Sequence, residues 1–203
     1  MATAVDYDPR LSVREARARY FADNAFGDDG GYNDTWVVLA RVGPIPLGFP
    51  NTPGRLRAVR YHDLHHLVTG YDTDFVGEAE IGAWELGGGC GSFTAAWVLN
   101  TLVLPIGAIR APTRTQQAWA RGARARTLYD RPFDEALLEL PLAELREQIG
   151  AGPDEDPHPT PTAAELRRYR VFVALGLLGQ ALSLAALLGA LAGLVYAVWA
   201  LLA

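Results

Sequence analysis

The sequence predicts a mostly α-helical protein: a helical domain with one small β-hairpin or extended arm, followed by a C-terminal transmembrane helix. Three observations predict this. Residues 171–203 contain no charged side chain, a run longer than the roughly 20 apolar residues that span a bilayer as a helix. Helix-capping signals recur through the preceding 170 residues. Only two short β-prone runs, on either side of Gly43-Pro44, interrupt them.

The N-terminal third predicts a helix, a loop and the small hairpin. Ser12 and Glu15 have capping-box spacing, and they predict an amphipathic helix through about Asn24. The stretch GDDGGYND is a loop by composition, and TWVVLARVGPIPLGFPNTPG holds the two β-prone runs. The first ten residues have no apolar core and no early positive charge, so we expect no secretory signal there.

Two consecutive helices follow. RLRAVRYHDLHHLVTG reads as a helix that stops at Gly70, and Asp72, Thr73 or Asp74 can cap the next helix, which extends to about Leu86. The short connection predicts that the second helix returns antiparallel to the first. Such a hairpin of helices would bring side chains of its two members face to face.

The remaining helices are shorter or more ambiguous. Residues 93–109 form an uncharged run of 17 that predicts a buried or membrane-resting helix, with a short span as the alternative. RTQQAWARGARARTLYD predicts a basic helix with Arg114, Arg121, Arg124 and Arg126, and PFDEALLELPLAELREQIG predicts two short amphipathic helices. We therefore assign a helical domain to residues 1–150.

The C-terminal part divides into a linker and an anchor. Residues 151–162 are rich in proline and predict a semi-extended linker, in which His158 is solvated. Residues 163–203 predict a basic juxtamembrane turn and a single-pass anchor that projects beyond the membrane, tilts or bends. Arg167, Arg168 and Arg170 precede the apolar run, so the positive-inside rule predicts a cytoplasmic location for the preceding domain.

Two whole-chain properties limit the possible functions. The net charge of the 203 residues is −5, with no basic excess, so the sequence gives no support to nucleic-acid binding. The single cysteine, Cys90, lies among glycines and predicts a small buried or loop thiol rather than a nucleophile.

Three of the four histidines gather within YHDLHH. His62 and His66 are four residues apart and therefore share one helix face, which is a spacing used by helical metal sites. Asp63 is near enough to be a ligand or to orient one, and a returning helix can place Glu78 opposite the two histidines. Imidazole and carboxylate together suit zinc, iron(II) or manganese. The sequence thus predicts a divalent-metal site of His62, His66 and Glu78, with Asp63 as a fourth ligand or as a group that orients one.

The spacing alone leaves a second interpretation open, because paired histidines on a helix are also found solvated or bonded to core carbonyls. His65 points away from the face of His62 and His66, which predicts a neighbouring or orienting group. Glu80 and Glu85 are further candidate carboxylates, and for Glu85 we expect a capping or surface role.

These residues carry a resemblance to a known family. His62-Asp63-x-x-His66, eleven residues and Glu78 match the H-D-x-x-H-x(11)-E signature of the Coq-four family of coenzyme Q (ubiquinone) biosynthesis. The surrounding HDLHHLVTGYDTDFVGEAEIGAWE and the helices up to Gly150 are also similar. The C-terminal anchor and the region from GDDGGYND to FPNTPG depart from the family pattern.

The resemblance implies a metal-dependent protein at a membrane face that acts on a prenylated aromatic acid. The implied activity is that of a lyase, an oxidative decarboxylation at the ring, with Asp63 and Glu78 as candidate catalytic residues. Implied partners are the membrane lipid or prenylated quinone precursor and other quinone-biosynthesis proteins, and an oligomer is compatible with the sequence. Two alternatives stay open: a non-catalytic lipid-binding scaffold with a structural metal, and a metal enzyme acting on a different membrane lipid.

Overall fold

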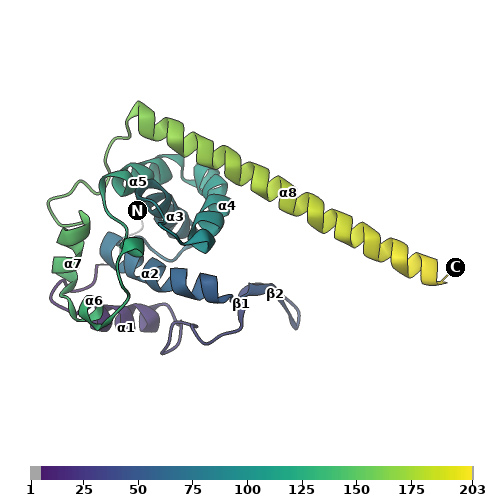
Figure 1. Ribbon diagram of the computed structural model, residues 1–203, viewed down its shortest axis with the longest axis horizontal. Coiled ribbons are helices and arrows are strands. Elements are labelled where there is room, and N and C mark those ends of the chain that lie inside the picture. The colour runs from purple at the N-terminus through teal and green to yellow at the C-terminus, as the bar shows by residue number, and fades with distance from the viewer. Residues whose placement is uncertain (1–5, 203) are drawn as a thin grey trace.

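A computed structural model describes residues 6–202 and confirms the mostly helical fold (Figure 1). A single two-stranded antiparallel sheet accompanies the helices in this described part of the chain. The elements in chain order are α1 Val13–Asp23, β1 Trp36–Val42, β2 Ile45–Pro50, α2 Pro53–Thr69, α3 Phe75–Gly88, α4 Thr94–Arg110, α5 Pro112–Arg124, the short 3₁₀ helix η1 Leu128–Asp130, α6 Glu135–Glu139, α7 Leu142–Ile149 and α8 Ala163–Leu202.

The helix ends follow the capping signals of the sequence. The Ser12 side chain accepts from the Glu15 backbone N–H while the Glu15 carboxylate accepts from the Ser12 N–H, which is the predicted capping box of α1. Helix α2 ends at Gly70, whose φ of 74° lies in the left-handed region that favours glycine. Asp74 caps α3 by accepting from two backbone N–H groups. Local sequence therefore sets where these helices start and stop.

The predicted hairpin is also present. Strands β1 and β2 pair from Trp36 opposite Pro50 to Val42 opposite Ile45, and Gly43 turns the chain with φ 59°. Figure 1 shows the hairpin projecting from the helical domain beside the start of α2. Val42 and Ile45, at its tip, are 62% and 59% exposed.

Helix α3 forms the centre of the domain and packs most closely on α5. A Cβ on Gly122 of α5 would overlap the backbone carbonyl of Trp84, and one on Gly87 of α3 would overlap that of Trp119. The two helices thus touch backbone to backbone, with the Trp84 side chain fully buried beside them.

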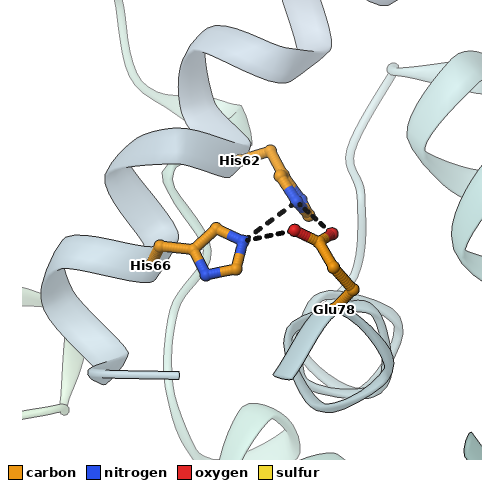
Figure 2. A group of neighbouring side chains, drawn as sticks. All are labelled: His62, His66 and Glu78. Carbon is orange, nitrogen blue, oxygen red and sulfur yellow. Dashed lines mark hydrogen bonds and ion pairs between the residues drawn. The ribbon is translucent and has the colours of Figure 1, made fainter. Parts of the chain in front are cut away.

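This packing corrects one expectation about α2 and α3. Figure 2 shows α2 lengthwise and α3 end-on, so α3 crosses α2 and does not return antiparallel to it. The physical reason is that a short connection does not set the angle between two helices, and α3 here packs backbone to backbone on α5 at Gly87 and Gly122.

Helices α4 and α8 form one side of the domain. The apolar run of residues 93–109 is helix α4, which packs against α3, α5 and α8, while Val98 and Ile109 remain 50% and 76% exposed. Gly176 and Gly179 of α8 lie against α4, and the Gln180 amide donates to the Leu102 carbonyl at 2.7 Å. The first half of α8 is therefore part of the folded domain.

The second half of α8 leaves the domain. The helix continues without interruption to Leu202, and Figure 1 shows it extending well beyond the other elements. Within the described residues it is the one helix long and apolar enough to cross a membrane, by length and composition. Its leucines are exposed, as at Leu188 (56%) and Leu194 (62%), and a Cβ built on Gly189 or Gly193 would meet open space beyond the helix's own neighbouring backbone. A C-terminal helix of this kind can anchor the protein in a membrane.

Candidate metal centre

His62 and His66 project from one face of α2 toward the same point (Figure 2). Their Nε2 atoms lie 3.2 Å apart, as the four-residue spacing predicts. His66 is buried and the His62 side chain is 19% exposed, so one edge of the pair reaches the surface.

Glu78 reaches this pair from the first turn of α3. The cap at Asp74 starts the helix. Gly77 allows the first turn to pack against the backbone of Asp72, because a Cβ at residue 77 would overlap the Asp72 carbonyl. Glu78 Oε2 lies 3.3 Å from His62 Nε2, and Oε1 lies 3.5 Å from His66 Nε2. All three side chains thus offer a ligand atom to one small volume, within 4.8 Å of one another.

Hydrogen bonds on the far side of each ring fix the tautomers. His66 Nδ1 lies 2.9 Å from the Tyr71 carbonyl oxygen, and His62 Nδ1 lies 3.0 Å from Glu85 Oε1. Both of these oxygens accept only, so each Nδ1 carries the hydrogen. In the neutral rings both Nε2 lone pairs then face each other, an arrangement that needs a proton or a cation between them.

The charges around His62 favour that cation. Burial lowers the pKa of His62, but the carboxylates of Glu85 and Glu78 outweigh it and hold the pKa well above its ordinary value. Burial opposes ionisation of Glu78 in turn, yet its interactions with His62 and His66 lower its pKa overall. The cluster therefore attracts positive charge to the point between the two Nε2 atoms and Glu78.

The spacing of the donor atoms fits a divalent metal. Four-coordinate sites with bonds of about 2.0–2.2 Å place neighbouring donor atoms about 3.3–3.6 Å apart. The two Nε2 atoms lie 3.2 Å apart, and each lies close to a different oxygen of Glu78, His62 to Oε2 at 3.3 Å and His66 to Oε1 at 3.5 Å. With one donor atom from each residue, all three lie within 4.8 Å of one another. Two imidazoles and one carboxylate make a donor set suited to zinc, and to iron(II) or manganese. With three protein ligands, a further coordination position is available for water or substrate.

Glu85 lies beneath this cluster, and our expectation of a capping or surface role for it was wrong. Its side chain is fully buried, and Oε1 accepts from Nδ1 of both His62 and His65, at 3.0 and 2.7 Å. Oε2 accepts from the Asn100 amide at 2.5 Å. Glu85 shares a helix face with Glu78, seven residues earlier, which was the available sequence signal. Three donors to a buried carboxylate keep it ionised: burial raises the pKa of Glu85, but the interactions with His62 and His65 outweigh burial and lower it overall.

His65 supports the cluster from the core. It is fully buried, its Nε2 accepts the Leu128 backbone N–H at 2.9 Å, and its Nδ1 donates to Glu85. Burial lowers the pKa of His65, so the ring stays neutral. The path Leu128–His65–Glu85–His62 therefore orients one of the two imidazoles through buried hydrogen bonds.

Asp63 lies beside the triad of His62, His66 and Glu78, and its carboxylate is not one of the groups that converge there. Its carboxylate accepts the Tyr32 hydroxyl at 2.6 Å, and its residue is 6% exposed. Burial raises the pKa of Asp63, although the bond from Tyr32 opposes this. Tyr32 comes from the glycine-rich loop before the hairpin, where no periodic pattern could predict the contact.

The other residues singled out in the sequence lie elsewhere. Glu80 is buried and makes a two-bond ion pair with Arg114, away from the histidines. Cys90 is fully buried, and burial raises the pKa of its thiol, which confirms a buried, unreactive cysteine. His158 is exposed, as expected for the linker.

A pocket of about 410 Å³ opens beside the triad, between α2, α3, the Gly-rich loop and the hairpin. Its polar wall contains His62, Asp63 and Glu78, and the Glu78 side chain is 42% exposed. Its apolar wall is formed by Phe26, Trp36, Val37, Val38 and Val59. The ligand atoms therefore face an amphipathic space and are not sealed in the core.

Comparison with known proteins leaves the family open. No family model matches the chain, and no curated protein or solved structure matches it.

Proposed function

We propose that this protein is a metal-dependent enzyme that acts on a lipid-tailed aromatic acid at a membrane surface. The observation that carries the proposal is the convergence of two oriented Nε2 lone pairs and Glu78 on one point at the wall of an amphipathic pocket. A site built to be structural would use four protein ligands and exclude solvent. Here three converge, and one of them is 42% exposed.

Each residue has a role that follows from its contacts. His62, His66 and Glu78 would hold the divalent metal, zinc or alternatively iron or manganese, which when bound would polarise an oxygen of the substrate. Glu85 and the Tyr71 carbonyl orient the two imidazoles. Asp63, with its burial-raised pKa and its bond from Tyr32, is placed to accept or return a proton in the pocket.

The finer proposal, a step of ubiquinone biosynthesis, is supported by the resemblance of His62, Asp63, His66 and Glu78 to the Coq-four signature. The reaction would replace the ring carboxylate of a prenylated hydroxybenzoate-type acid by a hydroxyl group taken from water, releasing CO₂, with dioxygen as the two-electron oxidant that leaves as hydrogen peroxide. The apolar pocket wall suits the isoprenoid tail, and α8 suits a substrate that resides in the bilayer. We also propose a cytoplasmic location of the domain, from Arg167, Arg168 and Arg170, and association with other quinone-biosynthesis proteins.

The test combines metal analysis with genetics. Purified full-length protein in detergent should contain one equivalent of metal, and His66→Ala should lose it. Disrupting the gene in its host should lower quinone and accumulate a carboxylated, prenylated ring precursor. A Glu78→Ala copy should fail to restore quinone, while Glu155→Ala, which changes an exposed glutamate of the linker, should restore it.

Three results would argue against the proposal. Unchanged metal content in His66→Ala would show that His66 does not hold the metal and would refute the proposed metal site. Full rescue by Glu78→Ala would favour the alternative of a non-catalytic scaffold. Normal quinone levels without accumulated precursor would favour the alternative of an enzyme that acts on another membrane lipid.

A further inference from the structure

Arg55 lines the same pocket as the triad, at its other end. It lies seven residues before His62 on α2, two helical turns or about 10 Å along the axis, on the stripe that also carries Val59. Among the described residues that line the pocket it is the one arginine or lysine. The pocket therefore has two sites for binding an oxyanion, the proposed metal and a guanidinium.

The guanidinium of Arg55 is held in place by neutral groups. Its Nη1 donates to Asn51 Oδ1 at 2.8 Å, and its Cζ lies 5.9 Å from the centre of the Phe49 ring. Asn51 is itself fixed, since its amide donates to the carbonyls of Asp34 and Gly31, so its oxygen must face Arg55. This network orients the Arg55 guanidinium, with its forked set of N–H donors, without neutralising its charge.

Arg55 has no carboxylate partner in the described part of the chain. The arginines Arg114, Arg124 and Arg146 each form an ion pair with an acidic side chain, and Arg55 forms none. The guanidinium is partly buried, and burial lowers the pKa of Arg55 below its ordinary value, although the charges of Asp63 and Glu78 across the pocket oppose this without forming an ion pair with it. Keeping an unpaired charge in a partly desolvated pocket costs free energy, which a bound anion would offset.

We propose that Arg55 is the residue that recognises the acidic head group of the substrate, by pairing its fork with a carboxylate. This rests on the proposed function, and it makes Arg55 a specificity residue rather than a catalytic one. A guanidinium matches a carboxylate in a planar, two-bond geometry that an ester or alcohol cannot reproduce. The apolar wall of Phe26, Trp36 and Val38 accommodates the tail of the same molecule.

The test measures binding of two probes to full-length protein in detergent by titration calorimetry. The probes are 3-geranyl-4-hydroxybenzoate and its methyl ester, which share the ring and the tail and differ in the head group, a charged carboxylate against a neutral ester. Titrations are made with chelator-treated and with zinc-loaded protein. The metal-free protein should already prefer the acid by about tenfold or more, the factor that a charged hydrogen bond gives.

The variants separate Arg55 from a general effect of charge. Arg55→Gln should reduce the preference for the acid to less than about threefold, with affinity for the ester unchanged. Arg55→Lys should keep part of the preference. Arg57→Gln, an exposed arginine on the same helix, should keep all of it. Zinc content equal to that of the wild type checks that each variant is folded.

The outcomes also distinguish this inference from the proposed function. Equal binding of acid and ester by the wild type, or a full preference for the acid in Arg55→Gln, would overturn the role of Arg55 and leave the metal site standing. An Arg55-dependent preference in a protein whose metal content does not depend on His66 would support Arg55 and refute the metal centre.

Discussion

Replacing Glu85 by glutamine should weaken both the fold and the metal site. The buried carboxylate accepts three hydrogen bonds, two from His62 and His65 and one from Asn100. In the variant, the amide oxygen keeps the histidine bonds at neutral strength, and the new NH₂ group then faces the Asn100 amide, which also donates. Bonds to a charged acceptor contribute about 1 kcal/mol more than neutral ones, and relief of the buried charge offsets part of the loss.

The net cost is therefore about 2 kcal/mol of the free energy of unfolding, which corresponds to a melting temperature lower by about 4–8 °C for a domain of this size. Because Glu85 orients the His62 ring, affinity for zinc should also fall by about 10- to 100-fold. The assays are thermal unfolding followed by near-ultraviolet circular dichroism, and zinc titration against a competing chelator, on the full-length protein in detergent.

Glu80→Gln is the matched control. Glu80 is also buried on α3 and ion-paired, but with Arg114, away from the histidines. It should lose stability and keep the zinc affinity of the wild type. Zinc affinity of Glu85→Gln within about twofold of the wild type would refute the orienting role that we assign to Glu85.

Three further predictions concern pH, the ligand set and the helix packing. Because Glu85 and Glu78 raise the pKa of His62 in the metal-free protein, a proton competes with zinc above the ordinary histidine range, so zinc affinity should still increase with pH above about 6.5; a plateau from pH 6.5 upward would contradict this. Asp63→Asn should retain stoichiometric zinc by elemental analysis while His66→Ala loses it, and equal loss in both would make Asp63 a ligand. Gly122→Ala should lower the free energy of unfolding by at least about 2 kcal/mol, because its Cβ would overlap a backbone carbonyl of α3, whereas Gly193→Ala, with open space around it, should leave the melting temperature unchanged.

Sequence reasoning succeeded where the cause is local. The capping box at Ser12, the left-handed Gly70 and the Asp74 cap each act within one turn of chain, so they determine helix ends without reference to the rest of the molecule. The shared face of His62 and His66 follows from the same helical periodicity.

It failed where the cause is a contact between distant segments. The crossing of α3 over α2 depends on backbone contact at Gly87 and Gly122, and periodicity does not determine a crossing angle. That crossing turns Glu85 into the core beneath the histidines. The contact of Tyr32 with Asp63 arises from an irregular loop, and the environment of Arg55 depends on a hairpin with no predictable orientation.

The continuity of α8 determines how far the pocket can travel from a bilayer. Residues 181–202 follow Gln180, whose side chain bonds to α4, and extend about 33 Å, close to the roughly 30 Å thickness of a hydrocarbon core. If residues 181–202 cross the bilayer, no flexible linker separates the membrane from the domain, because α8 is continuous. The domain would then stay at a fixed distance from the membrane surface. For a lipid-resident ligand such as the one we propose, the pocket would then search by lateral diffusion in two dimensions, and the encounter rate would depend on the mole fraction of that ligand in the lipid rather than on its concentration in water.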